Sequence, residues 1–443
     1  MIFERRESEV FERRESEVRS YCRTFPTVFR KAEGAELFGE DGKRYIDFFA
    51  GAGALNYGHN NPRIREKIIS YLNSCGIVHS LDMFTPAKRE FLQAMETLIL
   101  KPFAMDYKIQ FPGPTGTNAV EAAIKLARKV TGRSGIIAFT NGYHGMTAGA
   151  LAVTGNNYHR RTMGGMLGNT TFMPYDGYFG PDVDTADYLE KFILDESSGV
   201  DPPAAVLLET VQGEGGINVA SFHWLRRVEE ICHRNNILVI VDDIQAGCGR
   251  TGSFFSFTPA GMTPDIITLS KSLGAYGLPF SVVLLRPHLD CWDPGEHNGT
   301  FRGNNLAFVA ATEALRLYWT DTAFSQTVRH KAQILRHELD NIIGTMPPDM
   351  ALVRGRGLMC GMVFEHDAKL AKLITAEAFQ RGLILETCGA RDQVVKFLPP
   401  LIIDESLLLE GIAILRESVA SVLAACRNHK NEIDNTLAQE VST

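Results

Sequence analysis

The chain of 443 residues has no apolar run that approaches the roughly 20 residues needed to span a bilayer. Its first residues are charged, so we expect no secretory signal peptide. It also lacks a long basic run, and 45 basic against 52 acidic residues give a formal net charge of −7. Nothing therefore favours a nucleic acid or a membrane as partner. We expect a cytoplasmic protein that acts on small molecules.

Cysteine pairs are also missing. The eight cysteines show no C-x-x-C motif and no Cys/His spacing of the zinc-binding kind, so no metal site is predicted. We expect reduced thiols, mostly in the core. They are Cys22, Cys75, Cys232, Cys248, Cys291, Cys360, Cys388 and Cys426.

A duplication marks the start of the chain, where the octapeptide FERRESEV at 3–10 recurs unchanged at 11–18. Two copies of eight residues cannot build a solenoid, which needs at least three stacked units. We interpret the duplicated segment as a charged, helix-compatible extension of the kind that chain termini tolerate.

The middle of the chain alternates apolar runs with amphipathic helical patterns. Continuous apolar runs are typical of strands that are buried on both faces, so we predict an α/β fold with a mainly parallel sheet. A helix that begins after Ser221 joins two of these strands into a βαβ unit. The predicted strands span residues 135–140, 204–210, 237–243, 265–270 and 281–286.

Different patterns flank this region. Short alternating stretches at 35–58, with a turn at 39–44, predict an N-terminal meander. After about residue 315, long helical patterns surround strands near 358–364 and 394–403, and a last helix begins near Glu405. We expect a large domain at 66–320, a C-terminal small domain at 321–443, and an N-terminal segment, 1–65, that joins the small domain.

Two charged residues follow neighbouring predicted strands. Lys271 comes directly after the strand at 265–270, and Asp242 ends the strand at 237–243. A lysine in a cleft can lose its proton and serve as nucleophile and base, although a lone lysine at a strand end is more often simply solvated. Asp242 would need a cationic partner, and a protonated pyridine ring would supply one. Asp243 should face the opposite side of the sheet.

Three further segments follow strands or precede helices. Thr115, Gly116 and Thr117 precede a strong helix whose free amides suit a phosphate group, although an ordinary capped helix would look the same. The segment 141–145 could lay the ring of Tyr143 over a flat cofactor, with His144 beside it.

The run ETVQGEGG (209–216) brings Glu209, Gln212 and Glu214 to the end of another strand, where the carboxylates could position an amine. A solvated acidic turn is the alternative reading of this run.

Together these residues resemble the class III aminotransferases of pyridoxal-phosphate fold type I over about residues 25–404. The most specific elements are VDDIQAGCGRTG (241–252) and SKSLGAYGLP (270–279) at a fixed interval. The resemblance implies that pyridoxal 5′-phosphate is held by Lys271 as a Schiff base. It also implies a homodimer or a dimer of dimers with shared active sites.

Carried over position by position, the resemblance assigns roles to the candidate residues. Asp242 and Lys271 are the predicted catalytic residues, with Asp242 paired to the ring nitrogen. Thr300 would reach the phosphate of the neighbouring subunit, and Glu209 and Glu214 would line the substrate side. The cofactor-binding residues are Thr115, Gly116, Thr117, Tyr143, His144, Asp242, Gln245, Lys271 and Thr300.

Two departures from the class pattern concern the substrate. Asn118 stands where a glutamate is usual, and Lys396 stands where an arginine usually holds the substrate carboxylate. A lysine is a point charge and not a bidentate fork. Arg302 is therefore a candidate for part of that role.

Within the class, the motifs most resemble the branch that begins ectoine synthesis. That resemblance implies ping-pong transfer of the amino group of glutamate to L-aspartate 4-semialdehyde, which gives 2-oxoglutarate and L-2,4-diaminobutyrate. Three alternatives stay open: an aminotransferase for 4-aminobutyrate, ornithine or lysine; a same-fold aminomutase or epimerase; and a binding protein without activity.

Overall fold

The structure is a computed structural model that describes the backbone of residues 10–440 and the side chains of residues 10–428. The first copy of the octapeptide therefore lies almost entirely outside the described residues. In the second copy, residues 11–14 continue a short helix, and the whole segment 11–18 is exposed.

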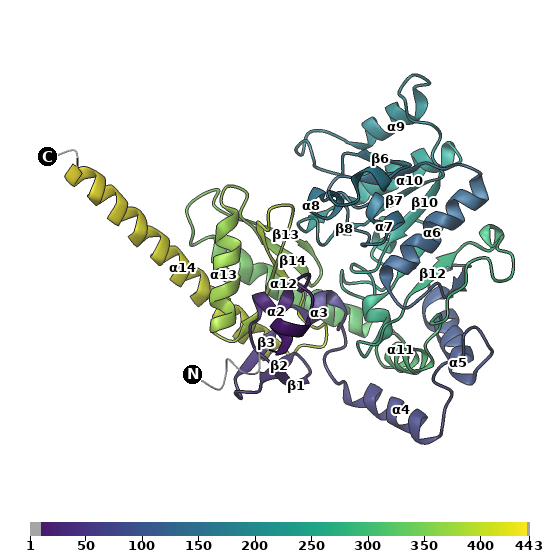
Figure 1. The fold of residues 1–443 in the computed structure, drawn as a ribbon, viewed down its shortest axis with the longest axis horizontal. Helices are drawn as coiled ribbons and strands as arrows, with labels where there is room; N and C mark the ends of the chain where they lie inside the picture. The colour runs from purple at the N-terminus through teal and green to yellow at the C-terminus, as the bar shows by residue number, and fades with distance from the viewer. Residues whose placement is uncertain (1–9, 441–443) are drawn as a thin grey trace.

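A seven-stranded sheet forms the centre of the large domain (Figure 1). The five strands from β11 to β6 are mutually parallel, and β12 and β4 extend the edge in antiparallel fashion. The predicted α/β fold with a mainly parallel sheet is confirmed. In spatial order the strands are β4 (Lys108–Gln110), β12 (Val282–Leu285), β11 (Ile266–Leu269), β10 (Leu238–Asp242), β7 (Ala205–Leu208), β5 (Ile136–Phe139) and β6 (Thr170–Met173).

Helices cover both faces of this sheet. Successive side chains of a strand point to opposite faces, so each strand packs against helices on both sides. Val239 and Val241 of β10 share one core cluster with α10 (Phe222–Arg234). Ile240 lies in another cluster with α6 (Gly116–Thr131). Ser221 caps α10, since its hydroxyl accepts a hydrogen bond from the backbone N–H of Trp224 at 3.1 Å. The uninterrupted apolar runs thus reflect burial on two sides.

The other helices of the large domain lie beside the sheet or near its antiparallel edge. α11 packs against both α4 and α5. The elements are α4 (Pro62–Asn73), α5 (Pro86–Ala94), α7 (Ala148–Ala152), α8 (Asn157–Arg160), α9 (Ala186–Leu194) and α11 (Asn305–Tyr318).

The two ends of the described chain share one sheet. The N-terminal strands β1 (Phe29–Glu33), β2 (Glu36–Gly39) and β3 (Arg44–Asp47) form a meander, and β3 pairs in parallel with β15 (Leu383–Ile384) from the C-terminal half. This pairing accounts for a small domain built from both ends, as the fold type implies.

A second sheet completes the small domain, in the order β13 (Leu352–Arg356), β14 (Met359–Val363), β17 (Val394–Phe397) and β16 (Glu386–Cys388). Three helices pack around these sheets, and the last of them extends away from the body of the protein (Figure 1). They are α12 (Ala323–Ile343), α13 (Ala368–Gln380) and α14 (Glu405–Glu440).

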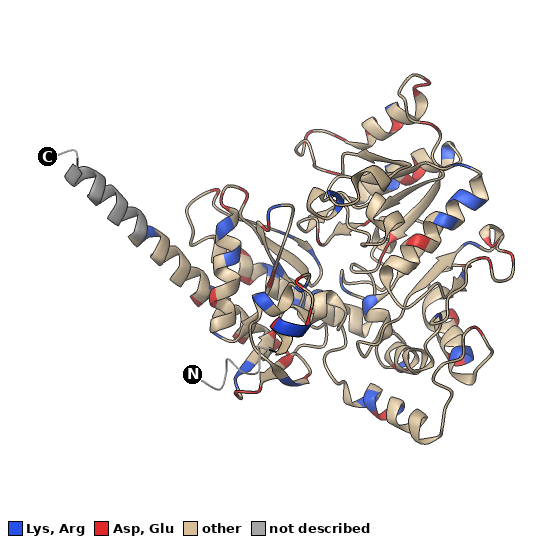
Figure 2. Ribbon diagram, in the orientation of Figure 1, with Lys and Arg blue, Asp and Glu red and all other residues tan. Residues whose placement is uncertain are grey.

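The prediction that the cysteines lie mostly in the core is wrong. Cys232, Cys248, Cys360 and Cys388 are buried, but the other four are exposed, and all eight are free thiols. Whether a cysteine is buried depends on which face of its helix, strand or loop carries it, and the number of cysteines gives no information about that. Acidic and basic residues are interspersed along the ribbon in both domains (Figure 2). Within residues 10–440, no helix is long and apolar enough to cross a membrane.

Candidate active site

Lys271 and Asp242 lie at the carboxyl ends of neighbouring parallel strands. Asp242 is in register with Thr268 of β11, three residues before Lys271. Lys271 begins a short 3₁₀ turn, η4 (Lys271–Gly274), with a left-handed φ of 48° that is strained for a residue with a side chain. Burial lowers the pKa of its amine, and no carboxylate of the described residues lies within 4.0 Å. The amine is therefore poised to lose its proton and act as nucleophile or base.

Asp242 is held in one orientation by three contacts. Its Oδ2 lies 2.7 Å from Nδ1 of His144, and its Oδ1 accepts hydrogen bonds from the Ile244 N–H and the Thr268 hydroxyl, both at 3.2 Å. A buried carboxylate with a fixed direction suits pairing with a protonated ring nitrogen. His144 is thus a support for Asp242, and a histidine viewed alone in the sequence did not reveal that.

Asp243 points elsewhere, as strand alternation predicts. Its carboxylate accepts hydrogen bonds from the N–H and the hydroxyl of Ser256. Burial raises its pKa to about 7. It therefore braces the loop after β10.

The amino end of α6 forms a cradle close to Lys271. Gly116 and Thr117 belong to the first turn of α6, where backbone N–H groups have no partner within the helix. A side chain at Gly116 would come 2.9 Å from Ile244 and 3.5 Å from Ser270, so only glycine lets the cradle pack so closely. The turn is braced by Asn118, whose Oδ1 accepts from the N–H and the hydroxyl of Thr115 at 3.2 and 2.8 Å.

The arrangement fits pyridoxal phosphate. Gln245 is buried, and its Oε1 has no hydrogen-bond partner among the described residues, so an acceptor is left for the ring hydroxyl. Asp242 offers a counter-ion to the ring nitrogen, the first turn of α6 offers amides to the phosphate, and Lys271 offers the amine for the aldehyde. These groups come from three separate segments of the chain, because Asp242 and Gln245 belong to the same one.

Glu209 and Tyr143 form one unit. The carboxylate of Glu209 accepts hydrogen bonds from the Tyr143 N–H at 3.0 Å and the Gly213 N–H at 3.4 Å. Burial raises the pKa of Glu209 to about 7. Glu209 therefore positions the loop that carries the half-buried Tyr143 ring. Gln212 donates to the carbonyl of Thr140 at 2.8 Å and so braces the same loop.

Lys396 and Glu214 meet as an ion pair. The buried Lys396 Nζ donates to Glu214 Oε1 at 2.6 Å, and Gln245 donates to the same oxygen at 3.1 Å. Burial alone would raise the pKa of Glu214, but the charges of Lys396 and Lys271 outweigh it and lower the pKa to about 2. The cofactor side and the predicted substrate side of the site are thus connected through Gln245.

Sequence reasoning missed two residues at this site. Glu386 lies 2.7 Å from Lys396 Nζ, and Tyr21 lies close enough to Glu386 and Glu214 that their charges add to the effect of burial in raising its pKa. Glu386 is the register partner of Lys396 in the β16–β17 pair. Only a prediction of that pairing could have found Glu386, and no signal in the sequence singles out Tyr21.

Thr300 and Arg302 lie on a separate exposed loop. The Arg302 guanidinium is bonded to Asp82 and to the carbonyl of His297, and His79 contacts the carbonyl of Thr300 at 2.9 Å. Neither residue contacts Lys396 or Lys271 among the described side chains. Within one subunit, the structure does not bring these two predicted residues to the rest of the site.

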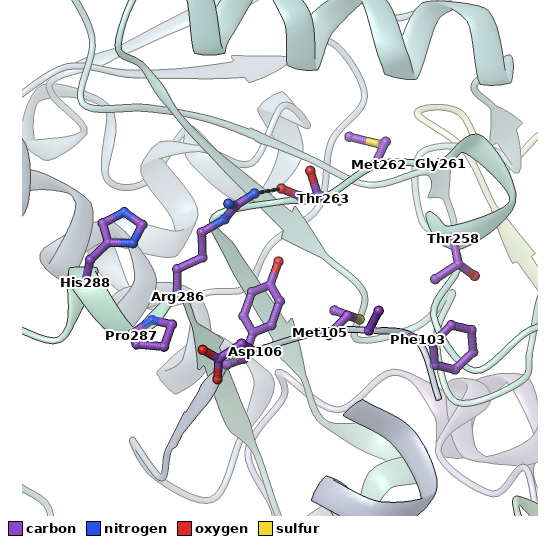
Figure 3. A pocket seen from close by; sticks show the side chains of 12 residues that line it. Phe103, Met105, Asp106, Thr258, Gly261, Met262, Thr263, Arg286, Pro287 and His288 are labelled. Carbon is purple, nitrogen blue, oxygen red and sulfur yellow. Dashed lines mark hydrogen bonds between the residues drawn. The ribbon is translucent and has the colours of Figure 1, made fainter. Parts of the chain in front are cut away.

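A cavity of about 540 Å³ lies elsewhere on the large domain, between the loops around Tyr107, Met262 and Arg286 (Figure 3). Arg286 donates to the carbonyl of Thr263, and the Tyr107 hydroxyl donates to that of Pro264. None of the predicted site residues lines this cavity, so we place no chemistry there.

Comparison with known proteins agrees with the geometry of the site. The sequence model of the family aminotransferase class-III matches residues 19–419. The chain is 56% identical to a diaminobutyrate–2-oxoglutarate transaminase of Bordetella parapertussis, over 96% of this chain and 95% of the relative. It is 55% identical to the transaminase of the same name from Halomonas elongata, over 94% and 98%.

A solved structure has the same fold. The ornithine aminotransferase from Toxoplasma gondii superposes with a TM-score of 0.83 at 27% identity, and the match covers 95% of each chain. The chain therefore belongs to the class III aminotransferases. It is a pyridoxal-phosphate-dependent enzyme of fold type I, and its cofactor is pyridoxal 5′-phosphate.

Proposed function

We propose that the protein is a diaminobutyrate–2-oxoglutarate transaminase. It moves the amino group of glutamate to L-aspartate 4-semialdehyde by a ping-pong mechanism, at the first step of ectoine synthesis. The observation that carries the proposal is the 55–56% identity, along almost the whole chain, to several relatives of that name. The Lys396 departure from the class pattern concerns the substrate side and leaves the cofactor residues in place.

The residues divide the chemistry among themselves. When bound, pyridoxal phosphate draws electrons from the carbon that carries the amine. Lys271, once freed, would take the proton from that carbon and deliver it to the C4′ carbon of the cofactor, on the other side of the nitrogen; its lowered pKa favours the neutral amine that this transfer needs. Asp242 holds the positive charge on the ring, and His144 keeps Asp242 aimed.

One site must accept two kinds of amine. Glutamate reacts through an amine next to a carboxylate, whereas diaminobutyrate reacts through a terminal amine that has no carboxylate beside it. Glu214 lies on a turn and its side chain is 29% exposed, so it has room to leave Lys396. We infer that Glu214 covers Lys396 when the terminal amine reacts and swings aside when the carboxylate of glutamate needs the lysine.

We infer a homodimer in which Thr300 serves the neighbouring site. An exposed apolar segment supports this inference, because the side chain of Phe84 is 100% exposed and that of Phe301 is 69% exposed. The segments that contain Phe84 and Phe301 lie together, because the backbone of His79 pairs with that of Asn304 and its side chain contacts the carbonyl of Thr300. Burial of such a surface against a second copy would remove water from large apolar side chains.

Mixed dimers test this arrangement. Lys271→Ala and Thr300→Ala subunits are each expected to have low activity alone, but a mixed dimer keeps one site with both native residues. Mixing the two proteins after partial denaturation should therefore restore activity toward one quarter of wild type. No recovery, in a sample shown by mass spectrometry to contain mixed dimers, would exclude shared sites.

A donor panel tests the function itself. Purified protein with 2-oxoglutarate is expected to prefer L-2,4-diaminobutyrate over 4-aminobutyrate, ornithine and lysine. A preference for another terminal amine would leave the aminotransferase class intact and overturn only the substrate. An aminomutase or epimerase would turn over without 2-oxoglutarate, so a reaction without the acceptor is the matched control.

We also propose a division of the chain into domains. The interval 319–322 separates α11 from α12, so the expected boundary at 320 falls between elements. A boundary at 65 would cut α4, and a boundary at residue 61 leaves this helix whole.

We also propose that the protein is located in the cytoplasm.

A further inference from the structure

Glu386 is a buried carboxylate of the site that has no role in the mechanism proposed above. It stands opposite Lys396 in the antiparallel β16–β17 pair, so both side chains lie on the same face of the sheet. Its Oε1 lies 2.7 Å from Lys396 Nζ, and its side chain is only 7% exposed. Lys396 is its sole ion-pair partner among the described residues. Glu386 belongs to strand β16, whereas Glu214 lies on a turn.

The charges in this cluster do not balance. One ammonium group, on Lys396, faces the two carboxylates of Glu214 and Glu386 at 2.6 and 2.7 Å. Burial raises the pKa of Glu386 to about 7, with a further rise from Glu214, and Lys396 offsets only part of this. A buried carboxylate that shares its counter-ion with a second carboxylate is stabilised by any further cation that binds beside it.

Glu386 also acts through its charge on two other residues of the site. Its charge acts on Lys271, the residue that exchanges with the substrate amine. It acts as well on the hydroxyl of Tyr21, whose pKa is raised by burial and then by Glu386. Glu386 and its partner Lys396 are therefore close enough to Lys271 to act on the charge of a substrate that reacts there.

We propose that Glu386 binds the second ammonium group of a diamino substrate and so makes the site select diamines. This inference rests on the proposed function. L-2,4-Diaminobutyrate reacts through the amine on C4 and carries an ammonium and a carboxylate on C2. The C2 ammonium is the missing cation for Glu386, while Glu214 still covers Lys396. 4-Aminobutyrate has the same chain length and the carboxylate but no second ammonium, so it leaves Glu386 without a further partner.

Three amine donors separate these contacts. L-2,4-Diaminobutyrate offers both charged groups, 1,3-diaminopropane only the second ammonium, and 4-aminobutyrate only the carboxylate. In Glu386→Gln, we expect KM to rise by about tenfold or more for the two diamines, as for loss of a charged hydrogen bond, and to change by less than about twofold for 4-aminobutyrate. Glu386→Asp keeps the charge and should recover part of the diamine affinity.

Two controls separate binding from structural damage. Glu377→Gln makes the same chemical change in the same domain, at a partly exposed carboxylate paired with Arg381, and all three KM values should stay unchanged. Calorimetric titration of 1,3-diaminopropane into cofactor-loaded Lys271→Ala, with and without Glu386→Gln, reports binding in the absence of turnover. The added substitution should weaken binding by a factor similar to the change in KM.

The possible outcomes test the role of Glu386 separately from the proposed function. Equal changes in KM for all three donors, or a loss confined to kcat, would overturn the role of Glu386. If the wild type prefers another diamine such as ornithine, and diamine affinity still depends on Glu386, only the proposed substrate fails. A wild type that prefers 4-aminobutyrate over every diamine would overturn both.

Discussion

The Nδ1 atom of His144 lies 2.7 Å from the carboxylate of Asp242, and the two side chains are only 1% and 5% exposed. The histidine comes from the loop after β5 and the aspartate from the end of β10, two strands away in the sheet. The contact fixes which way the carboxylate points before any ligand arrives. The residue that we propose as the partner of the cofactor ring is thus preorganised.

Replacement of Asp242 tests this pairing. In Asp242→Asn the side-chain shape remains but the negative charge is lost, so the ring nitrogen is no longer kept protonated. We expect kcat/KM to fall by about 10²–10³-fold, as when other preorganised electrostatic groups are removed. His144→Ala should cause a smaller loss, because it frees the orientation of Asp242 and leaves its charge. Steady-state kinetics and the cofactor absorbance spectrum check both, and a larger loss in His144→Ala than in Asp242→Asn would contradict this order.

Lys396 is expected to matter for stability as well as for substrate binding. Lys396→Met leaves the buried Glu386 without a cation and facing the partly exposed Glu214, so the unfolding free energy should fall by about 3 kcal/mol. The KM for glutamate should rise at the same time, because its carboxylate loses a partner. Chemical denaturation and kinetics measure the two effects. Lys372→Met, at an exposed lysine paired with Asp392, should change neither.

Asp243 should make stability depend on pH. Its pKa is raised by burial to about 7, above the ordinary value of 3.8, so the folded protein binds this proton more tightly than the unfolded chain. The resulting stabilisation is complete below the unfolded pKa and is lost as the pH rises towards 7, at about 1.4 kcal/mol per pH unit. Asp243→Asn, which can keep both contacts with Ser256, should remove that part of the slope in denaturation experiments between pH 4.5 and 7. An unchanged slope would show that Asp243 does not titrate in this range.

Arg302 can be tested against its own ion-pair partner. If it helps to hold the substrate carboxylate, Arg302→Ala should raise the KM for glutamate by about tenfold. Asp82→Ala breaks the same ion pair but leaves the guanidinium free, so the KM should then stay the same or fall. Identical effects of the two substitutions would mean that only the loop anchor matters, and an unchanged KM in Arg302→Ala would exclude the clamp.

Much of the fold followed from local pattern. Apolar runs such as 237–243 indicated strands buried on two faces, and those strands form the sheet. Ser221 indicated the start of α10, and its hydroxyl caps that helix. Alternation along β10 separated Asp242 from Asp243, and their contacts differ accordingly. These predictions worked because each depends on residues that are close together in the chain.

Local patterns in the chain were enough to place Asp242 at the end of one strand and Lys271 just after its neighbour, and the motifs around them carried the resemblance that implied the cofactor. The side chains that meet across strands could be found only in the folded protein: His144 with Asp242, Glu209 with the Tyr143 loop, and Glu386 with Lys396. The physical reason is that strand pairing joins segments that are far apart in the chain. A buried charge takes its properties from those distant neighbours, and for that reason the second carboxylate at Lys396 could not be predicted from the motif that contains it.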